Sequence, residues 1–215
     1  MAGILKVDQV QSDSNLAFAI AGSNVAFMTA TSLQMVGSNV SLAGTNVITN
    51  GKVVSSGMPI GSVLQVVQAT LGGTQAVSGA SAWTDVTSLS VSITPTSASN
   101  KILVSFAVNC DGDTNLHFRI VRGATAIGVG NADGSRQQVS AANGYVPSNA
   151  SGTTMMTNQF LDSPATTSST TYKIQAYAND SAGSGTYYIN YASGDANNAY
   201  SSRCMSSITV MEIAA

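Results

Sequence analysis

Side chains that could do acid–base or nucleophilic chemistry are scarce in this sequence. Among 215 residues there is one histidine, His117, one glutamate, Glu212, and two cysteines, Cys110 and Cys204. Catalysis usually recruits His, Glu, Asp, Lys or Cys. No nucleophile-elbow pattern accompanies His117, which alternates with apolar residues along one strand. We therefore predict a protein that is not an enzyme. Sugar cleavage by a pair of aspartates is the weaker alternative, because the sequence places no two of them as a pair.

One segment resembles the start of a calcium-binding loop. Asp111-Gly-Asp-Thr-Asn115 presents oxygen ligands at alternate positions, as such loops do. The sixth position is Leu116 instead of glycine, and the twelfth is Arg122 instead of an acid, which excludes an EF-hand. A looser site that combines the two aspartates of this segment with Asp133 stays open beside an ordinary polar turn. We assign no metal-binding residues and no cofactor.

The spacing of the two cysteines is typical of neither a metal site nor a disulfide framework. Cys110 falls on the same strand face as Val108, and Cys204 falls on the same face as Ile208 and Val210. We predict two buried free thiols, with a single bridge between neighbouring core strands as the alternative.

The composition restricts the class of protein. Charged residues make up 8% of the chain and hydrophobic residues 44%, and the formal net charge is −2. This pattern is typical of extracellular and virion β-proteins. The few basic residues are scattered, so neither nucleic acid nor an anionic membrane is expected as a partner. We see no secretory signal and no stretch of about 18 apolar residues for a membrane span. The chain therefore fits a virion component that is assembled in the host cytoplasm and released by lysis.

The elements that position these residues are predicted to be strands, because apolar residues recur with a period of two. Turn clusters at 109–115, 131–134, 180–185 and 193–198 separate the strands at a spacing typical of antiparallel sandwiches. No segment longer than about ten residues has a helical pattern, so we expect an all-β chain. The clearest alternating positions are Leu89, Val91, Ile93, Leu116, Phe118, Ile120, Tyr172, Ile174 and Ala176.

The first part of the chain carries an approximate repeat. Its four copies are Gly22-Ser-Asn-Val25, Gly37-Ser-Asn-Val40, Gly44-Thr-Asn-Val47 and Asn50-Gly-Lys-Val53. Each unit is too short to bury its own apolar face, so it needs neighbours or copies in other chains. We predict that residues 1–58 form a docking arm or stalk and residues 59–215 a β-sandwich head. A hydrophobic linker, or an extended arm docked on another protein, is the alternative for the first segment.

Several phrases after residue 60 resemble a known class of proteins. They include Ile60-Gly-Ser-Val-Leu-Gln-Val-Val-Gln68, Phe118-Arg-Ile-Val-Arg-Gly123, Phe160-Leu-Asp-Ser-Pro-Ala165 and Ser206-Ser-Ile-Thr-Val-Met-Glu-Ile213. Together they are similar to the C-terminal domain of tail-fibre and related virion proteins of marine and cyanobacterial tailed phages. The resemblance implies a jelly-roll-like β-sandwich that assembles as a homotrimer, and it brings no active site. Domains of this kind also occur on capsids, as decoration or head-fibre proteins.

Aromatic residues near turn-rich segments are the candidate contacts for a receptor or glycan. We select Tyr145, Tyr200 and Trp83, because an aromatic ring at a loop offers an apolar face and a polar edge. Tyr187, Ile189 and Tyr191 are predicted to share a core-facing strand face, with Tyr188 on the other face. Loops 131–152 and 193–202 are almost uncharged, which favours neutral hydrogen bonding, as with glycans.

These observations predict a non-enzymatic phage virion protein, a trimeric tail fibre that takes part in host-surface attachment. Its partners would be two further copies of itself, other virion proteins through the N-terminal arm, and a host glycan or protein. A capsid decoration, cement or head-fibre protein that stabilises the particle is the first alternative. A monomeric glycan-binding module is the second.

Overall fold

The computed structural model describes residues 39–42, 45–49, 52–53, 57–78, 82–112, 115–143, 152–179 and 186–215. Within these ranges the named elements are all β-strands and no residue is α-helical, as the period of two predicts. No helix in the described part of the chain could span a membrane. The all-β prediction is confirmed.

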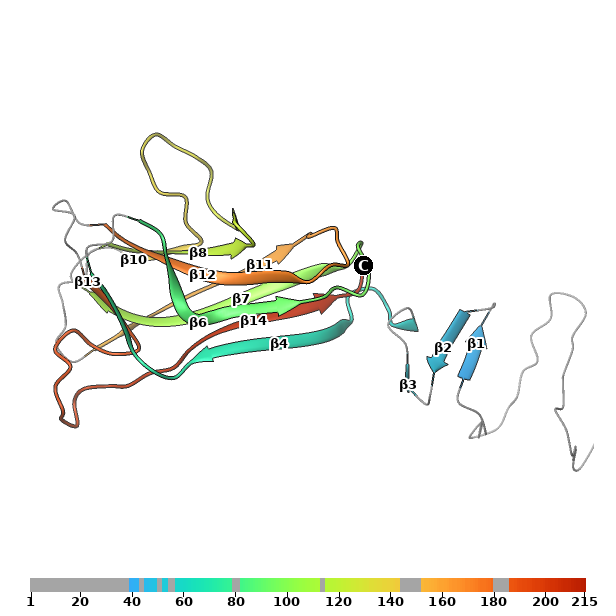
Figure 1. The fold of residues 1–215 in the computed structure, drawn as a ribbon, viewed down its shortest axis with the longest axis horizontal. Coiled ribbons are helices and arrows are strands. Elements are labelled where there is room, and N and C mark those ends of the chain that lie inside the picture. Colours follow the sequence, from blue (N-terminus) through green and yellow to red (C-terminus); the bar gives the residue numbers. More distant parts are fainter. Residues whose placement is uncertain are drawn as a thin grey trace, which may run out of the picture.

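Three short strands precede the head and form a small antiparallel meander. They are β1 (Asn39–Leu42), β2 (Thr45–Thr49) and β3 (Lys52–Val53), in the order β1-β2-β3. Each contains the valine of one copy of the repeat, so the described residues of the last three copies lie in strands; the first copy, residues 22–25, lies outside the described residues. In Figure 1 the meander lies beyond the end of the head at which the C-terminus is found.

The head consists of two antiparallel sheets. Sheet I contains β4 (Val63–Leu71), β14 (Ser206–Ile213), β7 (Lys101–Gly112) and β11 (Thr154–Asp162), side by side in that order. The short strands β13 (Thr186–Ile189) and β5 (Gln75–Ser78) extend it beside the far end of β7. Sheet II contains β6 (Thr84–Ile93), β12 (Thr170–Asn179) and β8 (Asn115–Arg122), and then β9 (Thr125–Ile127) and β10 (Ala141–Asn143), which both pair with β8.

This strand order is that of a jelly roll. The orders β4-β14-β7-β11 and β6-β12-β8-β9/β10 place the first and last strands of the head next to each other. The long strands β4, β6, β7, β8, β11, β12 and β14 alternate between the two sheets. Two interlocked Greek keys produce this arrangement. The predicted jelly-roll-like sandwich is confirmed, and Figure 1 shows it as an elongated body with the two sheets stacked.

The apolar core lies between the two sheets, because every second residue of each strand points inward. Leu89, Phe118 and Ile174 are fully buried, as their alternation predicts. The connection predicted at residues 109–115 is shorter than expected. Strand β7 continues to Gly112 and β8 begins at Asn115, so only residues 113–114, which lie outside the described part, separate them.

The two ends of the head differ in what they carry. At the end that we call the arm end, the Gly61 amide donates to the Ala214 carbonyl and the Ala214 amide donates to the Ser62 carbonyl, at 2.8 and 2.9 Å. These bonds hold the entry of the chain beside the end of β14. The opposite end, which we call the distal end, carries the long connection from β13 to β14 (Figure 1).

Two predicted core assignments at the distal end are wrong. Tyr187 and Ile189 are fully buried, but Asn190 has a φ of 68°, which turns the chain so that Tyr191 leaves the core face and is half-exposed. Cys110 is a buried free thiol, as predicted. Cys204 is also free, but it precedes β14 and is half-exposed, because the strand begins only at Ser206.

Candidate functional site

The outer face of sheet II carries a group of aromatic and planar side chains near the distal end. We call Trp83, His117, Arg119 and Tyr177 the aromatic cluster. Tyr177 of β12 lies opposite His117 of β8 in the strand register. The pair formed by Gln175 and Arg119 lies two residues further along the same two strands. Since their neighbours in sequence face the core, these positions face away from it.

A β-bulge in β6 decides that Trp83 joins this cluster. Counting in twos from the buried Leu89 would place residues 87, 85 and 83 in the core. The register with β12 shifts instead between Lys173 and Gln175, and Ser88 in this stretch has a φ of 62°. Val86 is consequently buried, and Asp85 is exposed. Between the pairs at Lys173 and Gln175, β6 runs five residues, from Ser90 to Asp85, while β12 runs two. The excess of three is odd, so it reverses the facing of the residues that precede it, as a bulge does.

The rings of the aromatic cluster contact one another in a line. The guanidinium carbon of Arg119 lies 4.1 Å from the centre of the Trp83 ring, a cation–π contact. The Trp83 and Tyr177 ring centres are 5.4 Å apart and tilted by 39°. The Tyr177 and His117 rings are nearly parallel, with centres 6.1 Å apart. The cluster therefore presents several flat, half-exposed groups on one sheet surface.

Hydrogen bonds fix the polar neighbours of the cluster. The Gln175 side-chain oxygen accepts two bonds from Arg119, at 2.9 Å from Nε and 2.7 Å from Nη2. The Gln175 amide nitrogen donates to Asp85 at 2.7 Å, and the Lys173 ammonium lies 2.8 Å from the other Asp85 oxygen. Partial burial raises the pKa of Asp85, but the bonds from Lys173 and Gln175 outweigh it, so the pKa is lowered overall. The carboxylate is thus charged at neutral pH.

His117 is held as a neutral ring. Burial lowers the pKa of His117 below its ordinary 6.5, because the charged form is less well solvated there. Its Nδ1 atom is buried and makes no hydrogen bond with any described residue. No described cysteine, serine or acid shares a hydrogen bond with this imidazole, so the cluster lacks the pairing of base and nucleophile that covalent catalysis requires.

A second surface lies in the connection between β13 and β14. The Tyr188 and Tyr191 rings meet edge to face, 5.1 Å apart, and the Arg203 guanidinium lies 5.4 Å from the centre of the Tyr191 ring. Arg203 also forms an ion pair with Asp195. We call residues 193–203 the distal loop.

The distal loop encloses a small open cavity and presents an exposed tyrosine. The cavity has a volume of about 210 Å³ and is lined by Asp195, Ala196, Asn197, Asn198, Ser201 and Arg203. The side-chain oxygen of Asn198 accepts bonds from the amides of Tyr200 and Ser201, at 3.0 and 3.1 Å, which shapes the turn. Tyr200 is 82% exposed at this turn.

The three residues selected from the sequence have different positions. Tyr200 is an exposed side chain of the distal loop, and Trp83 is half-buried within the aromatic cluster and not at a loop tip. Tyr145 lies outside the described residues. Arg119, Tyr177 and His117 were not predicted from the sequence as partners of Trp83. Their shared outward parity was visible, but their strand register was not.

The aspartates of the looser calcium site that the sequence left open do not form a metal-binding cluster among the described residues. Asp111 is buried and accepts a bond from the Ser193 amide at 2.7 Å. Asp133 is exposed and pairs with Arg136 at 2.9 Å. Asp113 lies outside the described part of the chain.

The arm end contains a buried carboxylate that the sequence reasoning left unassigned. Glu212 of β14 has no exposed surface. One of its oxygens accepts bonds from the Thr96 amide, the Thr96 hydroxyl and the Asn100 side chain, at 2.6 to 2.8 Å. The other accepts a bond from Gln65 at 2.6 Å. Burial raises the pKa of Glu212, but these bonds together lower it below its ordinary 4.5. The arrangement is structural, since every donor belongs to the fold.

Comparisons with known proteins yield only weak similarities. No protein-family model and no curated protein matches the chain. Among solved structures, the chain is similar to that of infectious bursal disease virus strain Gx, with 16% sequence identity and a TM-score of 0.34. The match covers 70% of this chain and 37% of the viral chain. The chain is also similar to that of the VP2 subviral particle of infectious bursal disease virus, with 13% identity and a TM-score of 0.34. That match covers 71% of this chain and 42% of the VP2 chain. This chain thus spans less than half of either protein, and we transfer no residue or activity from them.

Proposed function

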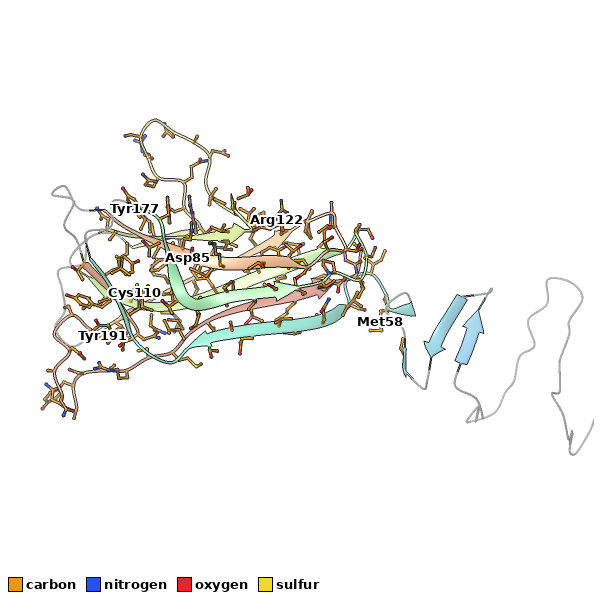
Figure 2. The ribbon with its side chains drawn as sticks, in the orientation of Figure 1. Met58, Asp85, Cys110, Arg122, Tyr177 and Tyr191 are labelled. Atoms are coloured by element: carbon orange, nitrogen blue, oxygen red, sulfur yellow. The ribbon has the colours of Figure 1, made fainter. Side chains whose placement is uncertain are left out.

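We propose that the chain is a non-enzymatic structural protein of a virion, whose head binds the host surface through its distal end. The observation that carries the proposal is that the two ends of the head carry different features. The chain enters at the arm end, whereas the half-exposed aromatic cluster and the exposed Tyr200 lie towards the opposite end. Figure 2 shows this separation, with Met58 at one end and Tyr177 and Tyr191 towards the other. Such a layout suits a protein that is held at one end and binds at the other.

The chemistry of the aromatic cluster supports binding over catalysis. Its flat rings offer apolar faces, while Gln175 and Arg119 are fixed by hydrogen bonds and need little reordering when a ligand arrives. The charges beside it are paired, as Lys173 is with Asp85. A neutral ligand with an apolar face and many hydroxyl groups fits this surface. A glycan has that chemistry.

The distal loop offers a second contact for the same class of ligand. Its cavity is lined mostly by small and amide side chains, and its ion pair between Asp195 and Arg203 is internal. Tyr200, an exposed aromatic side chain, belongs to the same loop. The aromatic cluster and the distal loop would together bind a branched surface polysaccharide.

The chain would assemble on the virion as a homotrimer. A homotrimer held by residues 1–58 would present three distal ends at once, which raises avidity without any new contact. We propose a tailed-phage tail fibre as the particle component. A capsid decoration or head-fibre protein is the alternative, supported by the exposed apolar residues Met58 and Ile60, which a shell subunit could cover.

Binding of the labelled full chain to host cells and to an array of their surface glycans tests the attachment role. The variants Trp83→Ala and Tyr200→Ala should each weaken binding about tenfold, the equivalent of about 1.4 kcal/mol. Met155→Ala, which truncates an exposed side chain on the outer face of the other sheet, is the matched control. If the wild-type chain binds no host glycan, or neither variant weakens binding, the attachment role is wrong.

The position on the particle is tested separately. Gold-labelled antibody against the chain should mark the tail of purified virions in electron micrographs. Labelling over the shell would contradict the tail-fibre assignment and support a capsid decoration protein. Absence of the chain from purified virions would contradict both assignments.

A further inference from the structure

The outer face of sheet I carries a line of apolar side chains that crosses the whole sheet. In the strand register, Met211 of β14 lies between Val66 of β4 and Leu103 of β7. Leu103 in turn lies opposite Leu161 of β11. We call these four residues, one from each main strand, the apolar row. Neighbouring strands are about 4.8 Å apart, so the row is continuous.

The side chains of the apolar row are accessible. Val66 is 55% exposed and Leu161 is 53% exposed, and the two residues between them are half-buried. Two further apolar residues continue the surface toward the arm end: Val63, 49% exposed, and Ile60, 85% exposed. Isolated exposed apolar residues are ordinary, but a contiguous set on one sheet face marks an interaction surface.

The same face is almost free of charge. The next outward positions on the four strands are Gln68, Thr209, Ser105 and Gln159, all neutral. The outward residues of β7 from Lys101 to Ala107 lie in line with the residues paired to them on β4, β14 and β11. Lys101 is the one charged residue among them, and its ammonium donates to the Ser163 hydroxyl at 3.0 Å. The outer face of sheet II, by contrast, carries Asp85, Lys173 and Arg119. A neutral face can meet an identical neutral face without burying an ion.

We propose that the apolar row is the surface through which one copy of this chain binds another. Two observations select a second copy as the occupant. The absence of opposed charges makes the face compatible with itself. In addition, the apolar surface runs into residues 57–61, where the chain leaves for the N-terminal segment, so copies joined through that segment would bring their apolar rows together at the same end.

The inference names the surface for the homotrimer proposed above, and it rests on that proposal. Around a three-fold axis near the arm end, each sheet I would face its neighbours through the apolar row. The distal ends, on which the aromatic cluster and the distal loop lie, would stay outside the contact. Assembly and ligand binding therefore use separate residues and can be altered independently.

Light scattering coupled to size exclusion, over a dilution series of the full chain, tests the inference. The wild type should have three times the 21.8 kDa of one chain. The double variant Val66→Glu, Leu161→Glu places two carboxylates where they would be buried between copies. It should dissociate at a concentration at least about a hundredfold higher, because an unpaired charge is costly to bury.

Ser90→Glu is the matched control, since Ser90 is an exposed strand position on the outer face of sheet II. It should leave the mass unchanged. Circular dichroism and thermal unfolding should show that both variants fold, because the substituted side chains are at least half-exposed in one copy. If the folded wild type and the folded double variant assemble equally, the apolar row is not the contact surface, although the chain can still be a trimer. A wild-type mass of one chain at every concentration overturns both.

Discussion

Glu212→Gln should destabilise the head by about 2–4 kcal/mol, although it changes only one atom of a buried side chain. The carboxylate accepts four hydrogen bonds, and bonds to a charged group contribute about 1.5–3 kcal/mol each, against about 1 kcal/mol for neutral ones. A glutamine keeps an oxygen for Thr96 and Asn100. Its amide nitrogen must then face the nitrogen of Gln65, which cannot rotate away, because it also donates to the Thr94 carbonyl at 2.8 Å.

The effect should depend on pH in a defined direction. The pKa of Glu212 is lower in the folded than in the unfolded chain, so its contribution is complete above the ordinary value of 4.5 and is lost as pH falls through the folded pKa. Wild type and Glu212→Gln should therefore differ most at neutral pH and converge in acid. The variant should lack this part of the acid-induced loss of stability.

Thermal and guanidinium unfolding, both followed by the fluorescence of Trp83, the single tryptophan, measure the loss of stability and its pH dependence. At neutral pH the melting temperature of the variant should fall by about 5–15 °C for a domain of this size. Gln68→Ala is the control, since it removes an exposed hydrogen bond to Thr209 on the same strand pair and should cost below about 0.5 kcal/mol. A Glu212→Gln variant as stable as this control, or one with the acid sensitivity of the wild type, would refute the reasoning.

Two further predictions concern local features. Burial, with a smaller effect of the Asp111 charge, raises the pKa of Cys110 to about 12, so native protein treated with iodoacetamide at mildly alkaline pH should gain one adduct, on Cys204. Intact mass and peptide mapping should show the second adduct only in denaturant; modification of Cys110 in the native protein would be inconsistent with its burial. Ser88→Val should destabilise by about 1–2 kcal/mol, because a β-branched residue tolerates a φ of 62° poorly. Ser90→Val on the same strand should be nearly neutral in the same unfolding assay, and equal effects of the two changes would contradict the bulge.

Much of the fold was predictable because it depends on local alternation. The inward sets on β6, β7, β8 and β12 follow from the period of two, since a strand that buries one face must place its apolar residues at every second position. The predictions failed where alternation is interrupted, at Asn190, whose positive φ removes Tyr191 from the core face.

The candidate site was only partly predictable, since its members come from strands that are distant in sequence. Trp83 and Tyr200 were selected as aromatics near turns, and the structure gives them different surroundings. Arg119 and Tyr177 acquire a role only because β8 and β12 pair in one particular register. The bulge at Ser88 then turns Trp83 toward them. No local pattern contains that register.

The sequence by itself determined an all-β chain, poor in charge and in catalytic side chains, with a repetitive first segment, because composition and alternation are local properties of the chain. The tertiary structure alone decided which residues meet. It joined Trp83 to Arg119, buried Glu212 among four donors and aligned one apolar residue from each of four strands on the outer face of sheet I. Such contacts depend on strand order and register, which are set by the packing of the whole sandwich.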